Sequence, residues 1–596
     1  MKNSCNQTHT MSVRPDDLSF DASILPFSRK LSYLYIKEFS TDSRKEIGIY
    51  RSQKKYLLEG DAKCPVLLKL IPVENENYAS YSCRANPSMI KVETSQGSIQ
   101  AAFDNANLLR IESDHQAFQI HINEKECQNT VLLPDGACLL AFDPIGTLLL
   151  KPIRGSMKTI CQHENTNNAS RYIKFDPDDD GKIDIAIHYH IGIAQSSTTY
   201  RPFIDCVQEA WNDYLDWLSM YPPVLSEYEY VKNIAVYSVW SCYTAPTGVL
   251  TDPLIFYSKD YSALSWHSSY HAYAMSENVD MSVRTLLSVF NYQDEHGQLP
   301  DMIDDQYINM LATKPPIQGY VLTNLIKIWK DKFKRSHAEM LYPPFKKLYN
   351  WWMTMRDSDH DGIPQYNQGC ECGMDFTEML KDGTPVECPD LITYMILMAR
   401  SLEILTDMIG LDEECTFWKS EQDRLLKVLI TEFWDGDKFI ARLSTTHEIV
   451  DFDEAERLIP ILLGNLLPND IITKIARDLK DPKQYYTYGG FRTATPTEPD
   501  RPTGVIMDFT QIRIIPGLLE TNERALGLQT LENFCRLNLE KYPRFGYMEK
   551  AADGSMEEDI FEKVDFSNIF SALSSSTFLV MASILFREKN RAMGGE

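Results

Sequence analysis

Apolar positions between about Leu31 and Ala194 either alternate with polar ones or form short runs, and both patterns are typical of β-strands. Gly, Pro, Asn and Asp interrupt these runs at short intervals, as turn residues do. The sequence therefore predicts an antiparallel β-sandwich in this part of the chain. Examples of these predicted strands start near Leu31, Val66, Leu108, Phe118, Leu148 and Ile183. The segment Asp176-Pro-Asp-Asp-Asp-Gly lies between two of them and is predicted to form an acidic hairpin turn.

The hydrophobic period becomes helical near Pro202. Ile204 to Met220 is predicted to form a linker helix, and a short hairpin is predicted at residues 433–439. About twelve further helices are expected, which can close as six pairs into an all-α (α/α)6 barrel with its long loops at one end. They are predicted at residues 228–243, 264–276, 280–293, 316–332, 337–356, 390–409, 412–433, 455–464, 468–480, 508–519, 521–540 and 567–585.

The length of 596 residues exceeds what one hydrophobic core usually supports, so we expect a multidomain chain. The change of period places the boundaries. We predict an N-terminal arm at 1–27, a β-sandwich domain at 28–200, a linker helix at 201–226 and an (α/α)6-barrel catalytic domain at 227–596.

The formal net charge of −25 argues against nucleic acids and anionic membranes as partners. The polar N-terminus predicts no signal peptide, and no apolar run is long enough for a membrane span. The 13 cysteines include no C-x-x-C pair and no zinc spacing, so we expect reduced thiols, a cytoplasmic location and no metal or other cofactor in the active site. The oligomeric state stays open, a homo-oligomer included.

The segment 357–378 concentrates candidate catalytic groups, because six carboxylates lie in one stretch interrupted by Gly and Pro. Like charges and burial both raise the pKa of a carboxyl group, and a general acid that works near neutral pH needs such a shift. Trp351 and Trp352 lie just upstream and could stack on a sugar. The segment is therefore predicted to be a loop between helices that forms part of a carbohydrate-cleaving site.

The start of this segment supports a second interpretation. Asp357, Asp359 and Asp361 precede Gly362 in the pattern of a calcium loop. An EF-hand is excluded, since Gln368 stands where its bidentate Glu would be. A calcium site of another kind and a solvated acidic turn both stay open.

Several motifs occur in the order found in one enzyme family. Glu371-Cys-Gly-Met-Asp-Phe resembles the E-S-G-x-D-[FN] element of glycoside hydrolase family 63 and of the trehalases. Other segments are similar to W-D-S-A-F-H-A, Q-x-x-D-G-x-x-P, [KT]-P-P-x-H-G-W, D-L-N-A-Y and F-x-W-S-A of that family, and they start at Trp266, Gln293, Lys314, Asp390 and Phe566. The resemblance covers residues 228–586 and implies an inverting (α/α)6-barrel glycosidase.

By this resemblance Asp375 is the general acid and Glu549 the general base, with Glu557 and Glu558 as alternatives for the base. Inversion requires the two carboxyl groups to stand about 6.5–9.5 Å apart. The residues predicted to bind substrate are Trp266, His267, Gln318, Tyr320, Trp352, Glu371 and Asp508.

The chain departs from the family pattern at positions that normally line the sugar pocket. His267 replaces an Asp, Gln318 replaces a His, and Ile506-Met-Asp-Phe-Thr-Gln replaces the Y-W-R-G-P region. From the acidic loop and the resemblance, we nevertheless expect an inverting exo-glycosidase whose small-molecule substrate is an α-linked glucoside or a related glycoside. A sugar epimerase or isomerase that uses His267 and His271, and a non-catalytic carbohydrate-binding protein, are the alternatives.

Overall fold

The computed structural model describes residues 14–52, 64–164, 168–192, 197, 199–374, 377–495, 506–541 and 571–592. The chain forms two compact units, which meet in the sequence between Asp216 and Trp217. None of the helices in the described residues is long and apolar enough to cross a membrane.

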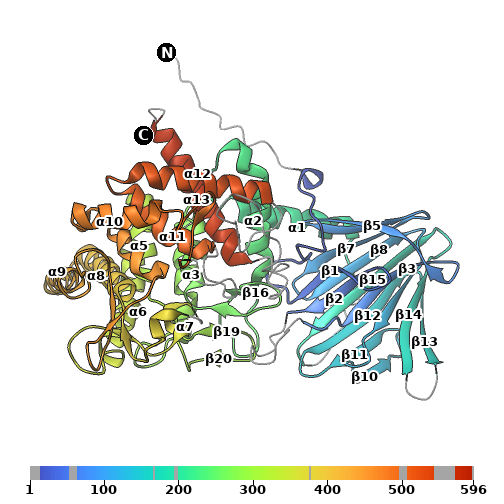
Figure 1. The fold of residues 1–596 in the computed structure, drawn as a ribbon. Helices are drawn as coiled ribbons and strands as arrows, with labels where there is room; N and C mark the ends of the chain where they lie inside the picture. Colours follow the sequence, from blue (N-terminus) through green and yellow to red (C-terminus); the bar gives the residue numbers. More distant parts are fainter. Residues whose placement is uncertain are drawn as a thin grey trace, which may run out of the picture. The chain divides into compact units, whose positions relative to one another are not determined.

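The first unit contains two antiparallel sheets (Figure 1). One has the strand order β1-β2-β3-β9-β14-β13, with β4 on β3, and the other has the order β10-β11-β12-β15-β8-β7-β6-β5. The strand bounds are β1 Leu34–Ser40, β2 Lys45–Arg51, β3 Leu68–Glu74, β4 Asn77–Tyr78, β5 Tyr81–Asn86, β6 Met89–Thr94, β7 Ser98–Asn105, β8 Leu108–Asp114, β9 Phe118–Ile122, β10 Asn129–Leu132, β11 Cys138–Phe142, β12 Gly146–Arg154, β13 Ser156–Glu164, β14 Asn168–Asp176 and β15 Lys182–His190. The predicted antiparallel sandwich is confirmed.

The inner faces of the two sheets are apolar. Ile47 and Ile49 on β2, and Ile185 and Ile187 on β15, are fully buried at alternate positions, as the two-residue period of a strand requires. The turn at Asp176–Gly181 differs from the prediction. It joins β14 to β15, which belong to different sheets, so it is a corner between sheets and not a hairpin. A turn sequence fixes a local reversal of the chain, but not the partner of the strand that follows.

The predicted linker helix forms α1 (Phe203–Leu218). Phe203 and Cys206 on this helix are buried against Ala102 of β7. The first half of the helix therefore packs on the second sheet of the first unit.

Most helices of the second unit follow the predicted segments closely. The one-turn helix α7 lies in the segment predicted as a loop, and α13 ends at Ala592 instead of residue 585. The helices are α2 Glu229–Cys242, α3 His267–Ala274, α4 Val279–Leu287, α5 Gln318–Trp329, α6 Arg335–Met355, α7 Gly369–Cys372, α8 Pro389–Ile409, α9 Asp412–Glu432, the 3₁₀ helix η7 Ala455–Leu466, α10 Asn469–Lys480, α11 Asp508–Leu519, α12 Arg524–Lys541 and α13 Ala572–Ala592. Short 3₁₀ turns are η1 Pro15–Asp17, η3 Ser226–Tyr228, η4 Ser288–Tyr292, η5 Lys330–Lys332 and η6 Glu378–Leu380.

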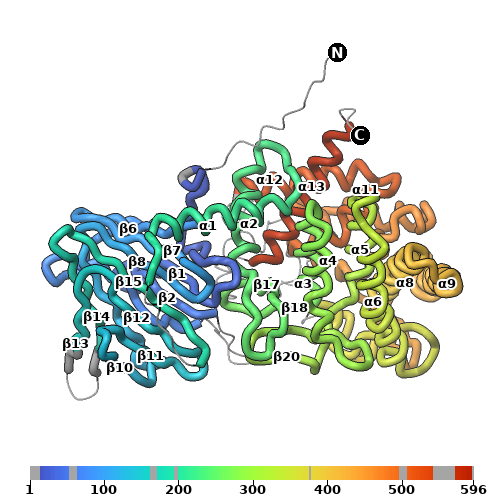
Figure 2. The backbone as a smooth tube through the Cα atoms, turned by 180° about the vertical axis from the view of Figure 1, so that it is seen from behind, coloured from blue at the N-terminus to red at the C-terminus, as the bar shows by residue number. Residues whose placement is uncertain are grey.

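Six of these elements close a ring by successive contacts, in the order α3, α5, α8, η7, α11, α13 and back to α3. A second set packs outside them: α2 on α13, α4 on α3, α6 and α9 on α8, α10 on η7 and α12 on α11. Figure 2 shows α3 and α4 running side by side. The predicted (α/α)6 barrel is therefore present in the described residues.

Burial explains which helices are inner and which are outer. Every residue of α3 is buried, as is every position of α13 from Ala572 to Leu585. Outer α9 buries little beyond Trp418, Leu425 and Leu429, which form one stripe of an otherwise charged helix. A helix with one apolar stripe covers a core, whereas a helix that is apolar or small-sided all round is surrounded by other elements.

Short strands connect the helices of this unit. They are β16 Tyr243–Thr244 with β17 Leu254–Ile255, then β18 Ala263–Leu264 with β19 Met302–Ile303 and β20 Ile308–Asn309, then β21 Gln365–Tyr366 with β22 Val386–Glu387, β23 Ala441–Leu443 and β24 Ile449–Val450, and finally β25 Tyr486–Thr487 with β26 Gly490–Phe491. The hairpin predicted at residues 433–439 closes through a single bridge between Trp434 and Phe439.

Candidate active site

Each inner element of the barrel carries polar residues at or just before its first turn. Trp266 directly precedes α3, Asp390 is the second residue of α8, and Asp508 begins α11. The N–H groups of a first helical turn lack partners within the helix and favour carboxylates or ligand oxygens. The other residues at such positions are His267 on α3, Gln318 on α5, Glu456 on η7 and Ser571 before α13.

Contacts between these helix starts bring four inner elements together. The Trp266 indole lies 5.5 Å from the Phe509 ring, and the Arg513 guanidinium lies 5.8 Å from the same indole. Arg513 donates to the Tyr394 hydroxyl at 3.0 Å and to Glu456 Oε1 at 3.4 Å. We call Trp266, Tyr394, Glu456, Phe509 and Arg513 the central cluster. It joins α3, α8, η7 and α11.

Polar atoms with no hydrogen-bond partner within the described residues gather at this cluster. Trp266 Nε1, the Tyr270 hydroxyl, Asp390 Oδ1 and Glu456 Oε2 are such atoms, and each belongs to a buried residue. Leaving a buried polar atom unpaired costs about 1–3 kcal/mol. Two donors and two acceptors on buried side chains at this cluster suit a ligand that carries several hydroxyl groups.

Burial raises the pKa of the carboxyl groups at the cluster. Desolvation raises the pKa of Glu456, and the nearby Asp390 adds to this effect while Arg513 opposes it. The pKa of Asp390 is also raised by burial, although Tyr366 donates to its Oδ2 at 3.0 Å. Glu454 has a raised pKa for the same reason, and the Glu456 charge raises it further. The pKa values of Glu454 and Glu456 reach about 7, so these two carboxyl groups can hold a proton near neutral pH.

The segment predicted to carry the general acid is anchored at both ends. A Cβ on Gly373 would stand 2.7 Å from the Trp266 indole, so the loop backbone lies against this ring and needs a glycine there. Glu378 N and Met379 N donate to the carboxylate of Glu454 at 2.9 and 3.4 Å, and the Thr377 hydroxyl donates to it too. Asp375 and the predicted base Glu549 lie outside the described residues, as do Glu557 and Glu558.

Glu371, predicted to bind substrate, is fully buried and holds the loop. Its Oε1 accepts from Arg356 at 2.7 and 3.0 Å, and its Oε2 accepts from Asn367 N at 2.7 Å. Lys314, which pairs with buried Asp301 at 2.8 Å, donates to the Cys370 carbonyl at 3.3 Å. Two buried ion pairs thus brace α7, directly before the acid position.

The other predicted substrate residues occupy different surroundings. His267 stacks on Trp266 at 5.8 Å, and burial holds its pKa well below 6.5, so this imidazole is neutral at physiological pH. Gln318 is buried, and its Oε1 has no partner within the described residues. Tyr320 is buried and donates to the Ile512 carbonyl at 3.3 Å. Trp352, on outer helix α6, packs with its ring 6.0 Å from the Tyr366 ring, whose hydroxyl donates to Asp390.

Sequence reasoning missed most of the central cluster. Tyr394, Glu456 and Arg513 were not among the predicted site residues. A signal was available for Arg513, because a lone charge between Ile512 and Ile514 in an apolar helix has to find a buried partner. The identity of that partner, Glu456, depends on how η7 packs against α11.

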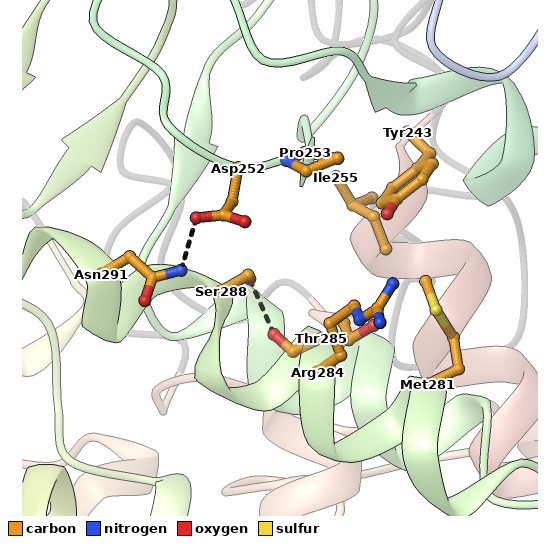
Figure 3. A pocket seen from close by; sticks show the side chains of 9 residues that line it. All are labelled: Tyr243, Asp252, Pro253, Ile255, Met281, Arg284, Thr285, Ser288 and Asn291. Carbon is orange, nitrogen blue, oxygen red and sulfur yellow. Dashed lines mark hydrogen bonds between the residues drawn. The ribbon is translucent and has the colours of Figure 1, made fainter.

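Figure 3 shows a pocket between the strands β16 and β17 and outer helix α4. Its volume is about 40 Å³, which holds a few water molecules, whereas ligand pockets measure about 300–1,000 Å³. Asp252 and Asn291, which line it, are joined by a 2.8 Å hydrogen bond. No residue of the central cluster lines this pocket, so we do not assign it to the sugar.

Asp508 leads to a pH-dependent expectation. Burial raises its pKa to about 7, so the folded chain keeps this proton up to that pH, whereas an unfolded Asp loses it near pH 4. The stability from this proton is therefore complete below about pH 4 and is lost as the pH rises to about 7. We expect Asp508→Asn to raise the free energy of unfolding by up to about 4 kcal/mol at pH 8 but by only about 1 kcal/mol at pH 4.5.

Urea unfolding at the two pH values measures this difference, with the exposed Asp382→Asn as the control. An effect of Asp508→Asn that is the same at both pH values would contradict the assignment.

Residues 260–500 match the family model described as the mannosylglycerate hydrolase MGH1-like glycoside hydrolase domain. Similar solved structures come from Thermus thermophilus, and each aligns over 59% of this chain and 99% of its own length. One is an uncharacterized conserved protein at 14% identity with a TM-score of 0.49. The other two are structures of a GH63 mannosylglycerate hydrolase. The complex with glucose has 15% identity and a TM-score of 0.48, and the complex with Tris and D-glycerate has 14% identity and a TM-score of 0.45.

The matched range runs from before α3 to beyond β26, so it includes Trp266, Tyr394, Glu456 and both anchored ends of the acid loop. The match confirms the resemblance to glycosidases that the sequence motifs indicate, since residues 260–500 are similar to a glycoside hydrolase domain.

Proposed function

We propose that the chain is an inverting exo-glycosidase that hydrolyses a small α-linked glucoside or a related glycoside. Mannosylglycerate, which the matched family model is named for, is among the substrates to test. Asp375 protonates the glycosidic oxygen, and Glu549 takes a proton from a water molecule that attacks the anomeric carbon from the opposite face.

The observation that carries this proposal is the set of buried polar atoms at the central cluster that are unpaired within the described residues. The apolar face of a sugar ring can stack on the indole. Asp390 Oδ1 and Glu456 Oε2 can then accept hydrogen bonds from sugar hydroxyls, and the Tyr270 hydroxyl can donate one.

Support for Asp375 as the acid comes from its described neighbours. Gly373 lies against the Trp266 ring, and Thr377 is bonded to Glu454. The acid position therefore falls between two residues that contact the candidate site. Glu454 fixes the far end of the loop with three hydrogen bonds, so the loop starts and ends at defined places.

The alternative epimerase or isomerase would need a histidine that gains and loses a proton. Burial holds the pKa of His271 at about 3, and its Nδ1 is bonded to the Ser576 hydroxyl at 2.7 Å. His267 is held neutral by burial as well. These surroundings favour hydrolysis by carboxyl groups over proton transfer by histidine.

The test is hydrolysis of mannosylglycerate and a panel of α-linked disaccharides, followed by proton NMR from the first turnover. We expect a new reducing end whose anomer is β, opposite to the bond that was cleaved. Release of the α anomer would overturn inversion. Sugar binding without any product, or a changed sugar with no bond cleaved, would overturn hydrolysis.

The proposal also places the enzyme in the cytoplasm. Most of the cysteines that the structure describes are buried, and no disulfide joins two of them, which suits a reducing compartment.

A further inference from the structure

A second cluster of carboxyl groups lies at the base of the acid loop, apart from the central cluster. Asp359, Asp361, Glu387 and His447 each place one ligand atom within 4.8 Å of the others. The first two belong to the D-x-D-x-D-G segment, Glu387 ends β22, and His447 lies between β23 and β24. Oxygens bound to one Ca²⁺ lie about 2.3–2.6 Å from the ion, so two of them stand at most about 5 Å apart, and the 4.8 Å of this cluster lies within that limit.

Glu387 gives the cluster a buried ligand. Its side chain is fully buried, Arg442 donates to its Oε2, and its Oε1 has no partner within the described residues. Asp357 is buried too. Its Oδ2 accepts from Gly362 N at 3.0 Å, and its Oδ1 is likewise unpaired among the described residues. Unpaired carboxylate oxygens in buried positions are costly unless a cation meets them.

Among the described residues, the guanidinium that pairs with this cluster is shared between several carboxylates. Arg442 is shared, because it donates to Glu387, to Asp361 at 2.8 Å and to Glu432 at 3.4 Å. His447 Nε2 lies 3.1 Å from Asp359 Oδ2 and 3.8 Å from Asp361 Oδ2, so the imidazole faces the same two carboxylates. One guanidinium shared in this way leaves an excess of negative charge that a divalent cation would neutralise.

We propose that Asp359, Asp361, Glu387 and His447 bind one divalent cation, which supports the acid loop. Carboxylate oxygens are the preferred ligands of Ca²⁺ and Mn²⁺, and a single imidazole nitrogen is compatible with Mn²⁺ in particular. The cation has no part in bond cleavage, since its ligands lie outside the central cluster.

The strand register explains how such a cation stabilises the site. Glu387 on β22 pairs with Gln365 on β21 and with Arg442 on β23. β21 directly precedes the acid loop and β22 directly follows it. Tyr366 on β21 donates to Asp390 of the candidate site at 3.0 Å. A cation bound to Glu387 therefore fixes the two strands from which the acid loop leaves and to which it returns.

Cation binding is tested on the full-length chain after treatment with a chelator. Calorimetric titration with CaCl2 or MnCl2 is expected to show one bound cation per chain. At a hundredfold excess over Kd, Tm should rise by about 3 °C. The absence of both binding heat and a Tm shift with either salt would overturn the proposal.

Variants locate the binding site. Asp359→Asn/Asp361→Asn should weaken binding at least about 100-fold, because ligand charge sets the affinity. The matched control is Asp178→Asn/Asp180→Asn in the other D-x-D-x-D-G segment, whose carboxylates are paired with Arg154. This control should leave the affinity unchanged. Equal loss in both double variants, or none in the first, would overturn the assignment.

Single changes test the two other ligands and guard against misfolding of the double variant. Glu387→Gln keeps a side-chain oxygen for Arg442 and removes the charge, so we expect weaker binding with an unchanged circular dichroism spectrum. His447→Ala should weaken Mn²⁺ binding about tenfold or more. An affinity unchanged in Glu387→Gln would overturn the proposal, and one unchanged in His447→Ala would remove His447 from the ligand set.

Discussion

Asp375→Asn is expected to lower kcat on the best glycoside substrate by about 10²- to 10⁴-fold, the range for removal of a general acid. The amide keeps the size of the side chain but cannot protonate the leaving oxygen. Tm should hardly change, because the loop is held by its neighbours, Gly373 against Trp266 and Thr377 bonded to Glu454. The variant should also lose the limb of the kcat/KM pH profile that falls at high pH.

Asp382→Asn is the matched control, since it removes the same charge from an exposed position in the same loop. Its kcat should stay close to that of the wild type. Turnover of Asp375→Asn within threefold of the wild type would reject Asp375 as the acid. Circular dichroism spectra of both variants show whether a loss of activity reflects unfolding.

Arg513→Met is expected to lower the free energy of unfolding by about 3–5 kcal/mol at pH 8, the usual cost of removing one partner of a buried ion pair. Arg513 and Glu456 are 0% and 1% exposed, so the Glu456 carboxylate would lose its cation without gaining water. The loss should be smaller at pH 5, because burial already raises the pKa of Glu456 and protonation removes the uncompensated charge. Activity should be lost together with the arrangement of the central cluster.

The double variant Glu456→Gln/Arg513→Met should recover much of the lost stability at pH 8, since it removes both charges. The control is Arg335→Met, which breaks the exposed Arg335–Glu339 pair of 2.8 Å on α6 and should leave stability unchanged. Urea unfolding at both pH values measures all three variants. A double variant no more stable than Arg513→Met, or an equal loss in Arg335→Met, would contradict the assigned role of the pair.

Much of the helical unit follows from local sequence. The segment predicted at 390–409 forms α8 at Pro389–Ile409, because Pro389 suits a first helical position and Gly410 adopts the left-handed conformation that ends the helix. The segment predicted at 508–519 forms α11 over the same residues. Local signals of this kind act within a few residues, so sequence alone can place them.

Strand pairing shows where this reasoning stops. β3 pairs with β9, and β8 with β15, across long stretches of chain. The turn at Asp176–Gly181 resembles a hairpin turn but leads from one sheet into the other. An alternating pattern states which face of a strand is buried, but it does not state which strand lies beside it.

The sequence by itself determined where the strands and helices lie, that an (α/α)6 barrel follows a sandwich, and which segment resembles the acid loop of a family 63 glycosidase. The tertiary structure alone decided that Trp266, Tyr394, Glu456 and Arg513 share one cluster, and that Glu387 joins the acidic loop. The physical reason is that hydrophobic periodicity determines which side of each helix is buried. Which helix starts then meet depends on how the whole ring closes, because residues distant in the chain become neighbours only when all the inner helices pack at once.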